Sequence, residues 1–395
     1  MSEKFQVLIL NNISAHGLKR LPAERFDHGK EIAKPDAILV RSADMHSMDI
    51  PKSVLAIGRA GSGTNNIPVK DMSKRGVPVF NAPGANANAV KELVLAGMLM
   101  AARNIGGAIR FVGGLDAKDP EMAKKVEGGK KTYAGFELSG HTLGIVGLGK
   151  IGCLVADAAI KLGMDVIGYD PEITVDAAWS LPSQVKKANS LSDVLKNANF
   201  VTVHVPLVDA TRKMINAGAL DQMKHGSVVL NFSRDGVVDE AAMLAALEAK
   251  KIATYVCDFP SPQVNNHPHV IALPHLGAST REAEENCAMM VADQVRDYLL
   301  DGNIANAVNF PNVSMPRESG FRIAVANANV PNMVGQISTA LAEAKLNIHN
   351  MVNKSKGDVA YTLVDVDSQV PKKAIDAIAK IEGVLAVRYL PVKGA

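Results

Sequence analysis

The stretch Thr142-Leu143-Gly144-Ile145-Val146-Gly147-Leu148-Gly149-Lys150-Ile151-Gly152 decides the fold of this chain. It predicts a buried strand, a glycine-rich turn and the start of a helix that continues to about residue 162. In such a turn Gly147 permits the tight bend, Gly149 lets the backbone approach a pyrophosphate, and Gly152 allows the helix to pack closely on the strand. Phosphate oxygens would meet free N–H groups at the positive end of the helix dipole.

The glycine spacing is more specific because Asp170 follows the next predicted strand, residues 165–169. A carboxylate there would accept hydrogen bonds from both hydroxyls of an adenosine ribose and repel a 2′-phosphate. We therefore predict that NAD, not NADP, is the cofactor. The alternative is a glycine turn in an α/β domain that binds no nucleotide.

Short runs rich in Val and Ile recur through the first three quarters of the chain, separated by stretches with helical periodicity. This alternation predicts α/β domains with doubly wound parallel sheets. The predicted strands are residues 6–10, 37–40, 54–58, 77–80, 142–146, 165–169, 200–203, 227–231, 254–258 and 270–273.

Two long helices, predicted over residues 88–103 and 281–300, flank the middle α/β segment. They could carry the chain out of a first domain and back into it. We therefore expect a discontinuous substrate domain and, between its two parts, a Rossmann dinucleotide-binding domain. The expected bounds are residues 1–92 with 282–312 for the substrate domain and 93–281 for the Rossmann domain.

The pattern changes after a loop rich in Pro, Ser and Asn. Residues 320–395 predict a separate small domain of the ferredoxin-like β-α-β-β-α-β order. Its predicted strands are residues 321–326, 347–352, 359–366 and 384–390, and its predicted helices are residues 332–344 and 372–381.

The composition excludes several classes of protein. Lys and Arg total 43 and Asp and Glu total 40, so a formal net charge of +3 gives no reason to expect nucleic acid as a partner. The longest apolar stretch, residues 93–102, is too short to span a membrane. Cys153, Cys257 and Cys287 form neither a disulfide framework nor a zinc cluster, so we predict a cytoplasmic protein without a metal site.

Arg234 and His275 each follow a predicted strand, at the sheet edge where doubly wound folds bind ligands. A guanidinium there can bind a carboxylate with two hydrogen bonds, and an imidazole can take a hydroxyl proton as hydride leaves the same carbon. The alternatives are a surface arginine and a histidine that caps a helix or fills the core.

Four segments together resemble the D-isomer-specific 2-hydroxyacid dehydrogenases, and among them the phosphoglycerate dehydrogenases with one C-terminal ACT domain. The resemblance covers essentially the whole chain, and its finer part rests on the C-terminal module and on residues 59–66. The four segments are Asn81-Ala82-Pro83-Gly84, residues 144–152, the segment around Arg234, and Pro274-His275-Leu276-Gly277-Ala278-Ser279-Thr280.

The resemblance implies a role for each matching residue. Arg234 would bind the substrate, His275 would be the acid and base, and the catalytic cleft would lie between the two α/β domains. Cofactor contacts are implied for Gly147, Gly149, Lys150, Ile151, Gly152, Asp170, Pro206, Ser233, Asp258 and Gly277. Substrate contacts are implied for Arg59, Ser62, Gly63 and Arg234, with Arg41 and Lys131 as further candidates for a phosphate.

One catalytic position departs from the family. The glutamate that supports the histidine is replaced by Gln263, and no Asp or Glu occurs over residues 259–274. Gln can orient an imidazole but cannot stabilise an imidazolium by charge. Asp258 is the alternative partner of His275. A different hypothesis is a non-catalytic protein that senses NAD or an amino acid.

The C-terminal module also matches its family incompletely. Asn329 and Asn347 match positions that contact serine in feedback-inhibited relatives, but Asn332 and Asn327 replace the usual glycine and histidine. A side chain in place of glycine could narrow the pocket. Serine regulation and plain dimerisation therefore both remain as interpretations.

The implied reaction is the NAD-dependent oxidation of 3-phosphoglycerate to 3-phosphohydroxypyruvate, the first step toward serine. The implied partners are a small phosphorylated 2-hydroxy acid and further copies of the chain, in a homo-oligomer that is a dimer or a tetramer. The alternative enzyme is a reductase of glyoxylate, hydroxypyruvate or another 2-keto acid.

Overall fold

The computed structural model describes residues 4–392, which form two compact units. Unit 1 combines the chain up to Asn86 with the chain from Arg281 onward, and unit 2 is Ala87–Thr280. The predicted fold class is confirmed, because two sheets are parallel and carry helices, and a small antiparallel sheet follows.

Unit 2 contains a seven-stranded parallel sheet in the order β12-β11-β10-β9-β6-β7-β8. The strand order reverses between β6 and β9, which is the switch point where doubly wound sheets bind ligands. The strands are β6 (Thr142–Val146), β7 (Asp165–Tyr169), β8 (Lys186–Lys187), β9 (Phe200–Val203), β10 (Ser227–Asn231), β11 (Ile252–Cys257) and β12 (Val270–Ala272).

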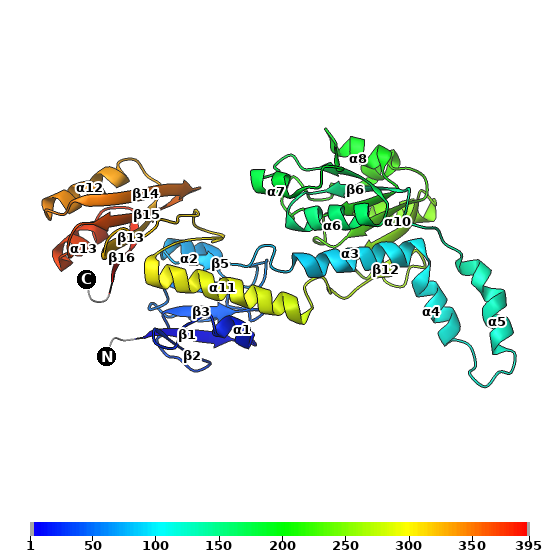
Figure 1. Ribbon diagram of the computed structural model, residues 1–395, viewed down its shortest axis with the longest axis horizontal. Helices are drawn as coiled ribbons and strands as arrows, with labels where there is room; N and C mark the ends of the chain where they lie inside the picture. The colour runs from blue at the N-terminus through cyan, green and yellow to red at the C-terminus, as the bar shows by residue number, and fades with distance from the viewer. Residues whose placement is uncertain (1–3, 393–395) are drawn as a thin grey trace. The chain divides into compact units, whose positions relative to one another are not determined.

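Helices cover both faces of this sheet (Figure 1). On one face α3 (Ala87–Ala102) and α6 (Lys150–Lys161) pack together over the strands. On the other face lie α8 (Leu191–Asn197), α9 (Ala217–Gln222) and α10 (Glu240–Glu248). Because both faces are covered, the central strands are continuous apolar runs, which is why the sequence predicted them well.

An arm of two helices extends away from the sheet of unit 2 (Figure 1). It consists of α4 (Ile105–Gly113) and α5 (Met122–Gly129), followed by a 3₁₀ helix over Lys130–Tyr133, and none of these helices contains a buried residue. Among residues 4–392 no single helix is long and apolar enough to cross a membrane. Only α3 and α4 taken together have that length and composition, and they are bent by 69°.

The first sheet of unit 1 has five parallel strands in the order β2-β1-β3-β4-β5. The long helix α11 (Arg281–Asp301) packs against it and buries Val291, Val295 and Leu299 in the core. The other elements are β1 (Phe5–Leu10), α1 (Ala15–Leu18), β2 (Phe26–Gly29), β3 (Ala37–Val40), β4 (Ala56–Arg59), α2 (Val69–Lys74) and β5 (Val79–Phe80).

The C-terminal module has the predicted β-α-β-β-α-β order and an antiparallel sheet in the order β14-β15-β13-β16. Its two helices share a core on one face, whereas Tyr361 and Leu363 on the other face join the core formed by α11 (Figure 1). The elements are β13 (Phe321–Ala328), α12 (Met333–Glu343), β14 (Ile348–Lys356), β15 (Val359–Val366), α13 (Lys372–Ala379) and β16 (Val384–Pro391).

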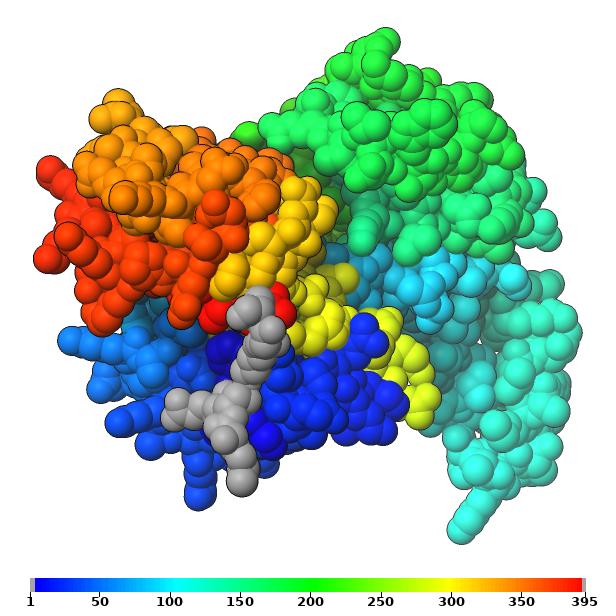
Figure 2. Space-filling model, turned by 60° about the vertical axis from the view of Figure 1, so that its left-hand side comes forward, coloured from blue at the N-terminus to red at the C-terminus, as the bar shows by residue number. Residues whose placement is uncertain are grey.

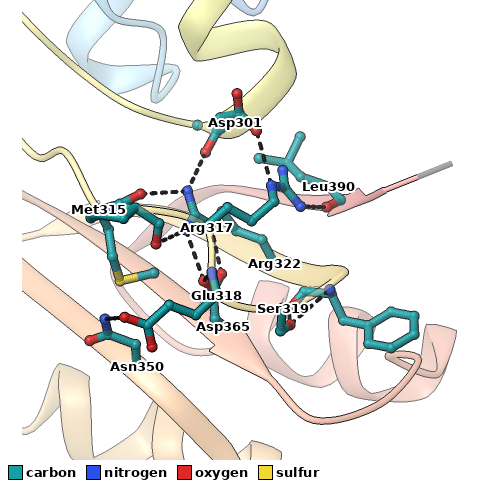
Figure 3. A network of polar contacts seen from close by, with 12 residues as sticks. Asp301, Met315, Arg317, Glu318, Ser319, Arg322, Asn350, Asp365 and Leu390 are labelled. Atoms are coloured by element: carbon teal, nitrogen blue, oxygen red, sulfur yellow. Dashed lines mark hydrogen bonds and ion pairs between the residues drawn. The ribbon is translucent and has the colours of Figure 1, made fainter. Parts of the chain in front are cut away.

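Arginine side chains fasten this module to the rest of unit 1 (Figure 3). Arg322 and Asp365 are fully buried and joined by two hydrogen bonds of 2.6 and 2.8 Å. Arg322 also donates to the carbonyl oxygens of Asp301, the last residue of α11, and of Met315. In the space-filling view the module, in orange and red, lies against the blue N-terminal part of unit 1 (Figure 2).

We predict that Asp365→Asn lowers the free energy of unfolding on the order of 3 kcal/mol, because it leaves the Arg322 charge buried without a counter-ion. The matched control is Asp376→Asn, which breaks the exposed pair with Lys372 and should cost less than about 0.5 kcal/mol. Urea unfolding of both variants measures the difference. Equal losses would contradict the role given to the buried pair.

Candidate active site

Residues from five turns of unit 2 meet at one edge of its sheet. Because β6, β7, β10, β11 and β12 are parallel, their carboxyl ends share that edge. The turns that follow them carry Gly147, Asp170, Arg234, Asp258 and His275. The structure therefore brings together the predicted cofactor and catalytic residues of this unit.

The glycine turn after β6 has no room for a side chain at Gly147 or Gly152. Gly147 has a φ of +94°, and an added Cβ would lie 2.5 Å from the carbonyl oxygen of His204. A Cβ on Gly152 would collide with the Gly147 carbonyl, whereas nothing lies within 4 Å of one on Gly149. Helix α6 begins at Lys150 with no side-chain cap on its first N–H groups. These residues fit a dinucleotide pyrophosphate.

The carboxylate of Asp170 stabilises this turn. Its Oδ2 accepts a hydrogen bond from the Leu148 amide at 2.8 Å, and its Oδ1 accepts one from the Glu172 amide at 2.9 Å. Each carboxylate oxygen can accept a further bond from a ribose hydroxyl. The helix that follows, α7 (Val175–Ser180), carries Trp179, which is 85% exposed.

His204, which the sequence reasoning did not single out, follows β9 beside the glycine turn. Its Nε2 lies 3.0 Å from the Thr202 hydroxyl, and its Nδ1 is buried without a partner among the described residues. Burial lowers the pKa of His204 to about 4, so the ring is neutral near pH 7. Pro206, a predicted cofactor contact, is exposed two residues later.

The turn that carries Arg234 is shaped by Asn231, a buried residue that sequence reasoning missed. Asn231 donates to the Arg234 carbonyl at 2.9 Å and accepts from both the amide and the hydroxyl of Ser233. The Arg234 side chain is exposed and donates to the Ser233 carbonyl. Within residues 4–392 no carboxylate lies in ion-pair range of it, so its fork can bind a ligand carboxylate.

The loop that carries His275 is fixed by Asp258, at the end of β11. Asp258 is 1% exposed, and its two carboxylate oxygens accept from the amides of Leu276 at 2.7 Å and Gly277 at 2.8 Å. Burial raises the pKa of Asp258, while these two hydrogen bonds oppose the shift. His275 itself has a φ of +55°, and its ring centroid lies 4.5 Å from that of Phe259.

Gln263 is exposed, and its backbone amide donates to the Ser261 hydroxyl at 3.3 Å. In the described chain no hydrogen bond joins Gln263 to His275. Support of His275 by Gln263 therefore stays a prediction, whereas Asp258 is bound directly to the His275 loop.

The predicted substrate residues of unit 1 lie at the end of β4 and in the loop after it, residues 59–66. The Ser62 hydroxyl lies 3.3 Å from Asn86 Oδ1, and the Ser62 carbonyl accepts from Asn81 Nδ2 at 2.5 Å. Gly63 lies in the same loop.

The two further phosphate candidates lie elsewhere. Arg41 forms an ion pair of 2.7 Å with Glu284 of α11, which competes with a ligand for its charge. Lys131 lies exposed in the 3₁₀ helix of the arm, in unit 2.

The predicted effector residues lie on exposed turns of the C-terminal module. Asn329 donates from its side chain to the Gly357 carbonyl at 3.0 Å. The Asn347 amide donates to the Asp367 carboxylate at 3.1 Å, and the Asn347 carbonyl accepts from the Asp367 amide at 3.0 Å. Asn332 has a φ of +64°, a left-handed conformation that glycine adopts without strain. Asn327 is only 1% exposed.

Residues 95–277 match the family described as D-isomer specific 2-hydroxyacid dehydrogenase, NAD binding domain. D-3-phosphoglycerate dehydrogenase of Escherichia coli (strain K12) is 34% identical over 355 residues, which are 86% of this chain and 82% of the relative. This chain belongs to the D-isomer specific 2-hydroxyacid dehydrogenase family. It is accordingly an NAD-dependent dehydrogenase, as the glycine turn predicted.

Solved structures of the family share its fold. The chain is similar to NAD+-bound 3-phosphoglycerate dehydrogenase of Entamoeba histolytica, with a TM-score of 0.60, 23% identity, and coverage of 78% of this chain and 99% of that one. It is also similar to D-mandelate dehydrogenase of Rhodotorula graminis, with a TM-score of 0.66, 22% identity, and coverage of 79% and 98%. Because enzymes named for different acids share this fold, the fold does not decide the substrate.

We predict that Asp170→Ala raises the KM for NAD about 10- to 100-fold, the loss expected for charge-assisted hydrogen bonds, and narrows the preference for NAD over NADP. The kcat should change little, because the ribose lies far from the reacting carbon. Asp176→Ala on α7 is the matched control, since that carboxylate is exposed on the same segment. An unchanged KM for NAD in Asp170→Ala would contradict the assignment.

We also predict a pH dependence of stability that comes from His204. Its pKa is lowered in the folded state, so the stabilisation is complete above the unfolded pKa of about 6.5 and is lost as the pH falls toward 4. The loss should approach on the order of 3 kcal/mol. Unfolding free energies at pH 7 and 4.5 should therefore diverge between the wild type and His204→Gln. Parallel pH curves for the two proteins would refute this origin.

Proposed function

We propose that this dehydrogenase oxidises 3-phosphoglycerate to 3-phosphohydroxypyruvate with NAD, as the first step toward serine. The observation that carries the proposal is the placement of Arg234 and His275 after β10 and β12, two strands that flank β11, at the same edge of the NAD-binding sheet. The phosphorylated substrate is supported by the relatives, which are named D-3-phosphoglycerate dehydrogenase.

In the proposed reaction the cofactor supplies the hydride acceptor. Arg234 binds the substrate carboxylate through its fork and polarises the C2 oxygen. His275 takes the proton of the C2 hydroxyl and returns it in the reverse direction. Asp258 positions His275, because its carboxylate is bonded to the two amides that follow it.

The substrate loop, which we define as residues 59–66, supports binding of the rest of the acid. It combines Arg59 with the backbone around Ser62 and Gly63. Arg59 is the preferred phosphate partner over Arg41, because it ends β4 directly beside Gly61, Ser62 and Gly63 of this loop. A reductase of glyoxylate or hydroxypyruvate is the second candidate, and it would need no phosphate partner.

Absorbance of NADH separates these functions. We expect a kcat/KM for 3-phosphoglycerate at least about 100-fold above those for D-glycerate and D-lactate, because the phosphate adds charge-assisted hydrogen bonds. Equal or greater rates with unphosphorylated acids would favour the reductase. Tight NAD binding without turnover of any acid would favour a sensor.

We predict that His275→Ala lowers kcat by about 10²- to 10⁴-fold, the usual contribution of a positioned acid and base. Arg234→Lys should recover little of the activity lost in Arg234→Ala, because lysine lacks the planar fork. Steady-state kinetics in both directions measures these effects. Arg212→Lys, on an exposed loop of the same unit, is the matched control. Near-full activity of His275→Ala would contradict the proposed role of His275 as acid and base.

For the C-terminal module we propose binding of serine at the turns of Asn329 and Asn347. The left-handed conformation of Asn332 supports the proposal, since it is one that the glycine expected at this position would also adopt. Serine titration of the oxidation rate tests it, and an unchanged rate would leave the module as a dimerisation element. Cys153, Cys257 and Cys287 are free and buried, which supports a reducing, cytoplasmic setting.

We further propose a homo-oligomer, a dimer or tetramer, in which the arm of unit 2 packs on another copy of the chain. Helix α4 exposes Ile109 by 66% and Val112 by 42%, and the ring of Phe111 meets Tyr133 at 5.5 Å within the arm. Apolar side chains that gather on one exposed helix are typical of an association surface.

We predict that the double variant Ile109→Asp with Val112→Asp has a smaller mass in solution than the wild type, because charges oppose burial of this face. Val175→Asp, at a position 72% exposed on α7, is the matched control and should keep the wild-type mass. Sedimentation at several concentrations provides the measurement. An unchanged mass for the double variant would exclude the arm as the interface.

A further inference from the structure

The tip of the β14–β15 hairpin touches the segment that follows α11. Lys356, the last residue of β14, donates from its Nζ to the carbonyl oxygens of Val308 at 2.9 Å and Ala307 at 3.2 Å. In the part of the chain that the structure describes, no carboxylate lies in ion-pair range of this ammonium group. The hydrogen-bond partners of the ammonium group are therefore the backbone carbonyls of Ala307 and Val308, in the segment 306–308.

Residues 306–308 continue the first sheet of unit 1 by pairing with the edge strand β5. Phe80 and Ala307 form an antiparallel bridge, and the Val308 amide donates to the Val79 carbonyl at 2.9 Å. The Asn81 amide reaches the Asn306 carbonyl at 3.4 Å. A shift of residues 306–308 would therefore be transmitted to the end of β5.

The end of β5 is joined directly to the substrate loop. Asn81 follows β5, and its side-chain amide donates to the Ser62 carbonyl at 2.5 Å. The Ala82 amide donates to the Gly61 carbonyl at 3.0 Å. The position of the loop backbone thus depends on where β5 ends.

The opposite side of the hairpin is held by Asn329. Its amide donates to the Asp358 carbonyl at 2.8 Å, and its side chain donates to the Gly357 carbonyl at 3.0 Å. Gly357 and Asp358 form the turn that directly follows Lys356. Hydrogen bonds, together with the peptide bonds between adjacent residues, therefore connect Asn329 through Lys356 and Asn81 to Ser62.

We propose that Lys356 is a positioning residue for the substrate loop, acting through residues 306–308, β5 and Asn81. The C-terminal module thereby takes part in binding the substrate acid, although it contributes no side chain to the loop itself. This inference rests on the proposed role of residues 59–66 in binding that acid.

The surroundings of Lys356 indicate that it positions the loop without contributing much to the stability of the fold. The contact borders an open cavity of about 440 Å³ that is also lined by Asn81, Asn306 and Asn312. Water can enter there and bond the carbonyls of Ala307 and Val308 when the lysine is shortened. The module stays attached through contacts elsewhere, including Arg322 with the Asp301 carbonyl and Tyr361 with the Gly302 carbonyl.

Steady-state kinetics of Lys356→Met tests the proposal. We expect the KM for the hydroxy acid to rise about tenfold, the value of one net hydrogen bond of about 1.4 kcal/mol, with the KM for NAD within about twofold. Lys356→Arg should keep the KM for the hydroxy acid close to the wild-type value, because arginine keeps the charge and the hydrogen-bond donors. The matched control is Lys354→Met, on the same strand and exposed. An unchanged KM for the acid, or an equal change in the control, would overturn the proposal.

Amide hydrogen exchange provides a readout that does not depend on the substrate. In Lys356→Met, peptides that cover residues 59–66 and 79–86 should exchange faster than in the wild type, while peptides from β6 and α6 should not. If no acid is oxidised by the wild type, the proposed function fails and this exchange still tests the positioning. Unchanged exchange over residues 59–66 would overturn the positioning role even in an active enzyme.

Discussion

Parallel hydrogen bonding between strands is the constraint on which the chemistry of unit 2 depends. It forces the ends of β6, β7, β10, β11 and β12 onto one edge of the sheet, so turns that are far apart in sequence become neighbours. The strands cannot slip in register, because both faces are covered and a slip would disrupt two cores. The edge is therefore a rigid frame, and the turns that leave it hold Arg234 and His275 in fixed positions.

Buried and half-buried polar side chains fix the conformations of the turns that leave this edge. Asn231 binds the turn of Arg234, Asp258 binds the turn of His275, and Asp170 binds the turn after Gly147. Each bond to a carboxylate contributes on the order of 1.5–3 kcal/mol, enough to hold one backbone conformation. The raised pKa of Asp258 shows the opposing cost, since its charge is kept away from water to bind two amides.

The sequence predicted the parts of the fold that depend on local pattern. Central strands such as β9 are continuous apolar runs, and the glycine turn has its own spacing. The edge strands β2 and β8 were missed because they are short and polar and each pairs with one neighbour. The arm helices were missed because they bury nothing and contain several glycines, which weaken the helical pattern.

Site residues could be predicted where a charged or titratable residue directly follows a strand. Contacts with a partner that is distant in the sequence could not. Arg234 and His275 could be located by their position in the sequence. The pairing of Arg41 with Glu284 could not, because it joins β3 to a helix more than two hundred residues later. The burial of Arg322 could not be predicted either, since a charged residue within a strand suggests an exposed face. Its ion pair with Asp365 allows the Arg322 side chain to be buried.

Trp179 has a consequence for how the protein can be observed. It is the single tryptophan of the chain, it is largely exposed, and α7 places it shortly after Asp170. Indole emission overlaps the absorption of reduced nicotinamide, so energy transfer can occur from this ring to a bound dinucleotide. Tryptophan fluorescence of the unmodified protein therefore comes from unit 2 alone, and an event in the C-terminal module changes it when that event reaches the surroundings of Trp179 or the bound dinucleotide.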